Sequence, residues 1–191
     1  MKENFLKFKE YIRGKRVAVL GIGISNRPLI KYLAGLGAMV TACDKKSRDD
    51  IGGICGELEG IGVELRLGSE YLTEMNDFQI IFKTPSLRLD IPELVHAAER
   101  GAVITSEFVK YCPAQMIGVT GSAGKTTTTT LIYKMLQGEG YRAWLGGNIG
   151  APLFDRLDQI GSGDKVVLEL SSFQLMTMNC SPDIAVITNL S

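Results

Sequence analysis

The stretch from Met116 to Thr130 constrains the fold of this chain more than any other. It joins an apolar run, a glycine turn, one lysine and a run of threonines. The apolar run suits a buried parallel strand, and Gly121 and Gly124 permit backbone dihedrals that a Cβ would forbid. A helix that begins near Lys125 would point its unpaired N–H groups into the turn. The pattern therefore predicts a strand, a loop and a helix that together cradle polyphosphate.

Two side chains of this phosphate loop are expected to bind the nucleotide and its metal ion. Lys125 is expected to reach the β- and γ-phosphates, and the Thr126 hydroxyl to ligate Mg²⁺. The loop departs from the usual P-loop pattern because Val119 stands where the first glycine belongs, and Gly118 lies one residue too early. The alternative is an ordinary strand-to-helix turn with a solvated lysine. The residues expected to contact the nucleotide are Gly121, Ser122, Ala123, Gly124, Lys125, Thr126 and Thr127.

A second glycine turn opens the first half of the chain. Residues 16–20 are typical of a buried strand that runs into Gly-Ile-Gly at residues 21–23, with a helix expected from 27 to 36. This order is typical of the start of a Rossmann-type domain. Asp44 follows the next expected strand, 38–43, where a dinucleotide-binding domain keeps its ribose-binding acid.

Two details argue against a plain NAD site in this domain. Asn26 replaces the third glycine of the dinucleotide fingerprint, and Lys45 with Lys46 directly follows the acid. The basic pair favours a phosphate or pyrophosphate over a bare ribose diol. A later strand, 79–83, runs into Thr84-Pro85-Ser86, and ligands of open α/β sheets bind at such strand ends. We therefore expect this edge to hold a phosphate-containing ligand.

The rest of the chain continues the alternation of strands and helices. Further helices are expected at 2–13, 51–59, 92–100, 108–111 and 126–137, and further strands at 62–67, 102–105, 141–145, 164–170 and 184–188. We predict an α/β protein: a Rossmann-like domain of residues 1–106 with a parallel sheet, then a P-loop mononucleotide-binding domain of residues 107–191. The second domain is expected to be incomplete, with about four parallel strands and an exposed edge that favours looseness or association.

Composition narrows the function classes. Of the 191 residues, 45% are hydrophobic and 22% are charged, and 21 basic residues balance 21 acidic ones. The bulk charge therefore favours neither nucleic acid nor a membrane as a partner. Apolar stretches fall short of the roughly 20 residues of a membrane span, and the N-terminus is too polar for a secretion signal, so a cytosolic protein is expected. The irregularly spaced cysteines and the single His96 indicate neither a zinc site nor a disulfide framework.

Two further positions in the second half suggest chemistry. Asn148 is flanked by glycines in the stretch 146–150, which is typical of a ligand-facing loop. Glu169 ends an almost wholly apolar strand, where a second Mg²⁺ contact is expected beside a phosphate loop. The alternative for Glu169 is a side chain turned to solvent at a strand end.

Three motifs coincide with one family. The segments Gly121–Thr127, Gly146–Gly150 and Leu168–Leu175 resemble the Mur ligases, and the resemblance covers essentially the whole chain. It implies an ATP-dependent ligase of peptidoglycan precursor synthesis, with Lys125 and Glu169 as catalytic residues and Mg²⁺ on Thr126 and Glu169. ATP would phosphorylate the carboxylate of UDP-N-acetylmuramoyl-L-alanine, and the amine of D-glutamate would attack the acyl phosphate.

The resemblance also implies where the substrates bind. The first domain would hold the UDP group, and the second domain the muramoyl-alanine end. No nucleic acid or membrane partner is expected, and the parent protein is expected to be a monomer. The residues implied for the UDP group are Ile24, Ser25, Lys45, Lys46, Thr84, Pro85 and Ser86; those implied for the muramoyl-alanine end are Asn148, Ser171 and Gln174.

The chain departs from the family in two ways. Ala123 replaces the usual asparagine of the loop. Family members also run to roughly 450 residues, a length that corresponds to three domains of the usual size, whereas this chain has 191 residues. The D-glutamate-binding domain would lie beyond Ser191, so the chain alone is predicted not to turn over. Two other classes stay open: a dehydrogenase-like NAD domain fused to a P-loop unit, with Asp44 on the ribose, and a non-catalytic nucleotide-binding module.

Overall fold

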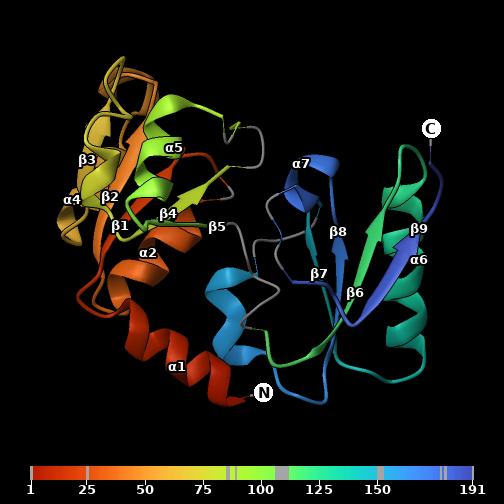
Figure 1. Cartoon of the computed structure of the whole chain (residues 1–191). Coiled ribbons are helices and arrows are strands. Elements are labelled where there is room, and N and C mark those ends of the chain that lie inside the picture. The colour runs from red at the N-terminus through yellow and green to blue at the C-terminus, as the bar shows by residue number, and fades with distance from the viewer. Residues whose placement is uncertain are drawn as a thin grey trace. The chain divides into compact units, whose positions relative to one another are not determined.

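The structure is a computed structural model that describes residues 2–24, 26–84, 87–88, 90–105, 112–149, 153–176, 178 and 180–190. The chain divides into two compact units, one of Lys9–Ser106 and one of Met1–Phe8 with Glu107–Ser191 (Figure 1). Each unit has a sheet whose described strand pairs are all parallel. The predicted α/β class is confirmed.

The first sheet has the strand order β3-β2-β1-β4-β5. Its direction of growth reverses at β1, so the carboxyl ends of β1 and β4 border the crevice where open α/β sheets bind ligands. The strands are β1 (Arg16–Leu20), β2 (Met39–Asp44), β3 (Glu64–Leu67), β4 (Ile80–Lys83) and β5 (Val103–Thr105). The helices are α1 (Lys2–Ile12), α2 (Arg27–Gly35), α3 (Arg48–Ile51), α4 (Ile54–Gly60), the 3-10 helix η1 (Met75–Asp77) and α5 (Pro92–Glu99).

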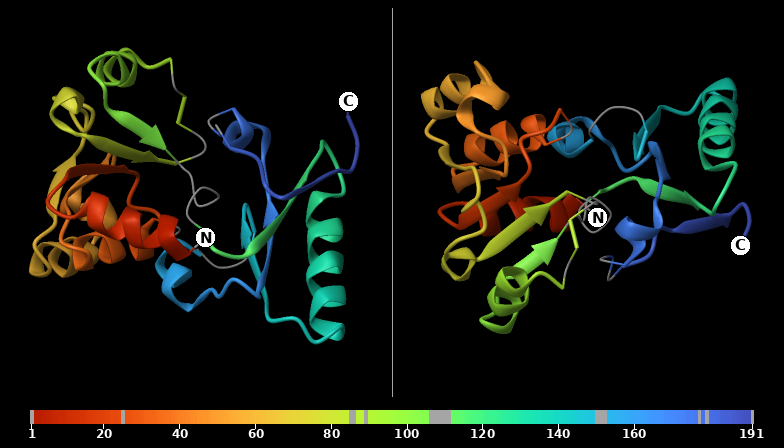
Figure 2. Two further views of the ribbon diagram at one scale, coloured as in Figure 1. Left: turned by 60° about the horizontal axis from the view of Figure 1, so that its bottom comes forward. Right: turned by 90° about the horizontal axis from the view of Figure 1, so that it is seen from above.

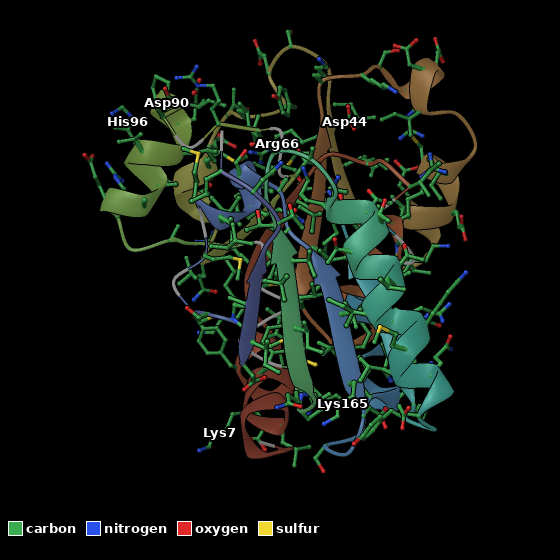
Figure 3. All side chains as sticks on the ribbon, turned by 90° about the vertical axis from the view of Figure 1, so that its right-hand side faces the viewer. Lys7, Asp44, Arg66, Asp90, His96 and Lys165 are labelled. Atoms are coloured by element: carbon green, nitrogen blue, oxygen red, sulfur yellow. The ribbon has the colours of Figure 1, made fainter. Side chains whose placement is uncertain are left out.

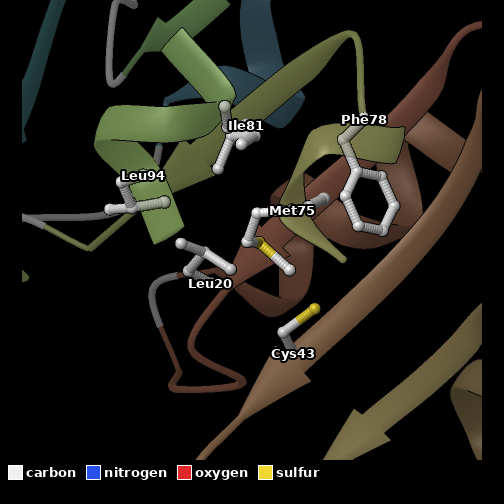
Figure 4. Close-up of a cluster of buried hydrophobic side chains, with 8 residues drawn as sticks. Leu20, Cys43, Met75, Phe78, Ile81 and Leu94 are labelled. Carbon is white, nitrogen blue, oxygen red and sulfur yellow. The ribbon is translucent and has the colours of Figure 1, made fainter. Parts of the chain in front are cut away.

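One cluster of buried side chains holds α5 and η1 to this sheet (Figure 4). Leu20, Ile81 and Leu94 are almost completely buried, and Cys43 and Met75 lie among them. Burial raises the pKa of the Cys43 thiol to about 12, so this cysteine is a protonated, inert core residue. Its side chain is fully buried in the core of the first unit.

The second sheet has the order β7-β8-β6-β9. The strand before the phosphate loop, β6, lies between β8 and β9, and helix α6 packs along β6, β7 and β8 (Figure 2). The strands are β6 (Gln115–Thr120), β7 (Ala143–Gly147), β8 (Lys165–Glu169) and β9 (Ile184–Ile187). The helices are α6 (Lys125–Gly138), the 3-10 helix η2 (Phe154–Gln159) and α7 (Ser172–Leu175).

Strand β9 is an edge of the described sheet and carries apolar side chains that face solvent. Ile184 is 43% exposed and Ile187 is 57% exposed. An apolar strand edge is a surface that favours pairing with further chain or another molecule. The predicted parallel strands with an exposed edge are confirmed within the described residues. No helix among those residues is long and apolar enough to cross a membrane.

The structure corrects one expected helix. The segment 51–59 forms parts of two helices, because α3 is closed at Gly52, whose φ is +73°, before α4 begins. A capping box between Ser47 and Asp50 starts α3, which places its beginning before the expected one. The expected helix at 108–111 lies outside the described residues.

The first core can be tested on two adjacent residues of α5. We expect Leu94→Ala to lower the free energy of unfolding by about 2–5 kcal/mol, because it leaves a cavity in the cluster. Val95→Ala, at a position that is 38% exposed, is the control and should change it by less than about 0.5 kcal/mol. Urea unfolding followed by circular dichroism measures both; equal losses would contradict this packing.

Candidate functional site

The phosphate loop connects β6 to α6 and depends on glycine at two positions. Gly121 has φ +139° and Gly124 has φ +79°, which are conformations that side chains with a Cβ rarely adopt. A Cβ on Gly121 would also lie only 2.1 Å from Oγ1 of Thr188. The loop is therefore held close to the end of β9, and its shape requires these glycines.

Two N–H groups of the loop converge on a single oxygen atom. Ser122 N and Ala123 N donate to Oδ1 of Asn189, at 2.8 and 3.0 Å. Successive backbone N–H groups that point to one place form a nest that binds anions or other acceptors. The following helix begins at Lys125 and has no acidic residue in its first turn, so its positive N-terminal end is not neutralised there. The geometry suits a phosphate oxygen.

The Lys125 side chain lies across the loop. Its Nζ donates to the carbonyl oxygens of Gly121 at 2.7 Å and Ser122 at 3.2 Å. The ammonium group is thus held over the same backbone that presents the N–H groups. Such a position places a cation where phosphate charge would be bound.

Glu169 is buried at the carboxyl end of β8, with only 2% of its surface exposed. Its Oε2 accepts a hydrogen bond from Oγ1 of Thr126 at 2.8 Å, and its Oε1 accepts one from Nδ2 of Asn148 at 3.1 Å. The alternative of a glutamate turned to solvent is therefore wrong. The structure brings together the two side chains that were predicted to ligate Mg²⁺.

This pair fits a magnesium ion better than a metal that needs a full protein cage. Carboxylate and hydroxyl oxygens are the hard ligands that Mg²⁺ prefers, and the ion commonly takes its other ligands from water and substrate phosphates. Within the described part of the chain, no group of three or more His, Cys, Asp or Glu side chains could hold a metal. Thr126 and Glu169 would accordingly supply two oxygen ligands.

The loop after β7 is fixed against the backbone of Glu169. Asn148 N donates to the Glu169 carbonyl oxygen at 2.8 Å. Gly147 has φ +93°, and a Cβ there would lie 2.2 Å from that same oxygen. The glycine therefore permits the approach that puts the Asn148 amide on the Glu169 carboxylate.

Ser171 and Gln174, predicted to face the muramoyl-alanine end, pair with each other in the structure. They form a capping box at the start of α7: Ser171 N and Oγ donate to Oε1 of Gln174 at 2.8 and 2.9 Å. This arrangement satisfies the end of a short helix directly after Glu169. A role in substrate binding remains a prediction.

A comparable glycine contact shapes the ligand edge of the first sheet. Gly21 has φ +98°, and a Cβ on it would lie 2.7 Å from Cγ2 of Thr84. Asn26, which replaces a fingerprint glycine, donates from Nδ2 to the carbonyl oxygens of Leu20 and Gly21, at 3.2 and 3.0 Å. The turn after β1 and the end of β4 are thereby packed together.

Asp44 uses both carboxylate oxygens on backbone groups at this edge. Oδ2 accepts from Ile22 N at 2.7 Å, and Oδ1 accepts from Lys46 N at 3.0 Å. The acid thus ties the first glycine turn to the end of β2. Lys45 and Lys46 are exposed beside it.

Of the remaining residues predicted to bind the UDP group, the structure describes only some. Ile24 is 81% exposed, whereas Ser25, Pro85 and Ser86 lie outside the described residues.

Sequence reasoning missed Lys83, which is buried and whose Nζ donates to the Leu87 carbonyl oxygen at 2.9 Å. Burial lowers the pKa of this lysine, and its signal in the sequence was a charged residue at the end of an apolar strand.

Figure 3 labels Lys165 and His96, which come from different units. Lys165 starts β8, at the opposite end of the strand from Glu169, and its Nζ donates to Oε1 of Gln115 at 2.8 Å. His96 is exposed on α5. Sequence reasoning also missed Thr188 and Asn189, a polar pair directly after an apolar strand, which was a signal of a strand-end site.

The fold and the loop geometry define the chain as an α/β protein of the P-loop type. Residues 119–191 match the family model of the Mur ligase middle domain. The whole chain is 62% identical over 194 aligned positions to "UDP-N-acetylmuramoylalanine--D-glutamate ligase" of Clostridium botulinum (strain Okra / Type B1), and 59% identical to the protein of that name in Clostridium kluyveri. These matches confirm the resemblance to the Mur ligases that the three motifs indicated.

The matches also set the extent of the likeness. The chain spans 42% of the length of these curated relatives, while all of the chain is covered. A solved murein peptide ligase from Psychrobacter arcticus 273-4 is 21% identical, with a TM-score of 0.50; it covers 93% of this chain, and the chain covers 43% of it. This last likeness concerns the fold alone.

The close approach at Gly147 gives a test of the site's geometry. Gly147→Ala should lower the free energy of unfolding by about 1–3 kcal/mol, because the backbone conformation is strained for alanine and the Glu169 carbonyl must move. The control is Gly138→Ala, where no atom lies within 4 Å of the added Cβ and helix propensity favours alanine. Thermal unfolding followed by the fluorescence of Trp144, the only tryptophan, reports on both. An unchanged Gly147→Ala variant would contradict the packing.

Proposed function

We propose that this chain supplies the ATP-binding and UDP-sugar-binding parts of a ligase that adds D-glutamate to UDP-N-acetylmuramoyl-L-alanine. The observation that carries the proposal is the hydrogen bond from Thr126 to the buried Glu169 beside the phosphate loop. It occurs in a chain 62% identical to relatives that bear this ligase's name. Because ATP and UDP-sugars are cytoplasmic metabolites, we expect the reaction to take place in the cytoplasm. We also expect the protein to be a monomer.

The reaction is an amide ligation through an acyl phosphate. The substrate carboxylate takes the γ-phosphoryl group of ATP, and ADP leaves. The amine of D-glutamate then attacks the acyl carbon, loses a proton, and inorganic phosphate leaves as the amide forms. Activation is needed because a carboxylate would otherwise have to expel oxide.

The chain's own residues serve the first step by binding charge. The N–H groups of Ser122 and Ala123 would donate hydrogen bonds to phosphate oxygens, and the helix that begins at Lys125 adds its positive end. Lys125 would turn from the loop carbonyls to the transferred phosphate, where a fixed cation stabilises the developing charge. Mg²⁺ on Thr126 and Glu169 would supply further neutralisation of the phosphates.

Binding of the UDP-sugar is assigned to the carboxyl edge of the first sheet. Lys45 and Lys46 are exposed there, and Asp44 fixes the adjoining turn, so two cations stand beside a shaped backbone. This arrangement suits a diphosphate. Ile24 and Thr84 would flank the ligand, together with Ser25, Pro85 and Ser86. Asn148, Ser171 and Gln174 would meet the muramoyl-alanine end.

A second candidate function is NAD binding by the first unit. The strand order of the first sheet favours it, because doubly wound sheets of this order bind dinucleotides. The hydrogen bonds of Asp44 count against it, because both carboxylate oxygens that would bind a ribose already accept backbone N–H groups. Binding of NADH without binding of the UDP-sugar would favour this candidate.

The proposed nucleotide site is tested by one pair of substitutions on α6. Lys125→Met should weaken Mg²⁺–ATP binding at least about tenfold, because hydrogen bonds to charged groups contribute about 1.5–3 kcal/mol. Lys134→Met is the matched control: the same change on an exposed position of the same helix should leave affinity unchanged. Isothermal titration calorimetry measures both.

The same titration tests the metal ligand. Glu169→Gln keeps the size of the side chain but removes its charge, so ATP affinity should no longer rise when Mg²⁺ replaces EDTA. The wild-type chain should show that rise. Loss of affinity that is equal with and without Mg²⁺ would instead mean that Glu169 only holds the fold.

A further inference from the structure

The phosphate loop already binds a side chain of its own chain. Oδ1 of Asn189 accepts hydrogen bonds from Ser122 N at 2.8 Å and Ala123 N at 3.0 Å. Asn189 lies just beyond the end of β9, 66 and 67 residues from these partners. The two N–H groups are among those assigned above to a phosphate oxygen.

The neighbouring residue fixes Asn189 in this position. Thr188 N donates to the Thr120 carbonyl oxygen at 2.9 Å, and Thr188 Oγ1 donates to the Ala123 carbonyl oxygen at 2.6 Å. The absence of a Cβ on Gly121 lets Thr188 approach this closely. The segment after β9 is therefore attached to the loop by backbone and side-chain bonds, and the Asn189 amide is directed into the loop.

We propose that Asn189 competes with the phosphate of the nucleotide for these two N–H groups. The inference rests on the proposed nucleotide-binding function of the loop. Each N–H carries one hydrogen, so an amide oxygen and a phosphate oxygen cannot both take it in a short, straight bond. A phosphate oxygen is charged and forms the stronger bond, so it displaces the neutral amide oxygen when the nucleotide binds.

The competition has a consequence for affinity. Asn189 keeps the loop closed on a protein acceptor when no nucleotide is bound, and binding must first break two hydrogen bonds. The free energy needed to break those two hydrogen bonds lowers the affinity for the nucleotide. Asn189 thus sets how tightly the loop holds its nucleotide, and it does so without contributing to the bound state.

Substitutions of Asn189 separate competition from support. Asn189→Ala removes the acceptor, and we expect Mg²⁺–ATP to bind roughly tenfold more tightly, as the loss of two ordinary hydrogen bonds in the free state implies. Asn189→Asp keeps the acceptor and adds charge that repels phosphate, so binding should weaken at least as much. Asn76→Ala, the same change at an exposed position of η1 in the first unit, is the control and should leave affinity near that of the wild type.

Calorimetry with Mg²⁺–ATP on the 191-residue chain gives the affinities, and amide hydrogen exchange gives a second readout. Without nucleotide, the N–H groups of Ser122 and Ala123 should exchange faster in Asn189→Ala than in the wild type. Equal or weaker ATP binding by Asn189→Ala overturns the competition, while wild-type binding leaves the proposed function intact. Failure of the wild type and all variants to bind overturns both. If Asn189→Ala binds Mg²⁺–ATP and the wild type does not, Asn189 competes strongly enough to prevent detectable binding.

Discussion

The carboxylate of Glu169 is the group on which the rest of the second unit depends. Burying such a group is costly unless hydrogen bonds or a cation compensate it. Its described partners are the Thr126 hydroxyl and the Asn148 amide, which come from the start of α6 and the loop after β7. One side chain therefore joins three elements at the carboxyl end of the sheet. Both of these hydrogen-bond partners are neutral side chains, which favours a cation beside the phosphate loop.

In both units, glycines at which a Cβ would clash allow loops and strand ends to approach one another closely. Gly147 allows a loop to touch the Glu169 backbone, and Gly121 allows the segment after β9 to touch the phosphate loop. In the first unit Gly21 packs against Thr84 in the same way. In each case the contact joins strand ends that are distant in the sequence. The parallel sheets bring those ends to one edge, and the glycines let the backbones meet there.

Much of the fold could be predicted because local patterns and tertiary packing agree. The apolar run before Gly121 is β6, and the strand expected at 164–170 is β8, which differs by one residue at each end. The expected helix at 51–59 failed because Gly52 interrupts a weak pattern. The Ser171–Gln174 pair carried a local signal of its own, because serine followed three residues later by glutamine is typical of a capping box. Asn189 could not be placed, since its partners lie 66 and 67 residues away and no local propensity records such a contact.

The most direct test of the account is to map two ligands onto the chain by NMR. Backbone amide shifts would be followed while Mg²⁺–ATP and UDP-N-acetylmuramoyl-L-alanine are added separately. The account predicts that ATP shifts the amides of residues 121–127 and Glu169, and that the UDP-sugar shifts those near Gly21, Lys45 and Lys46. ATP shifts confined to the first unit, or a UDP-sugar that perturbs neither edge, would contradict it.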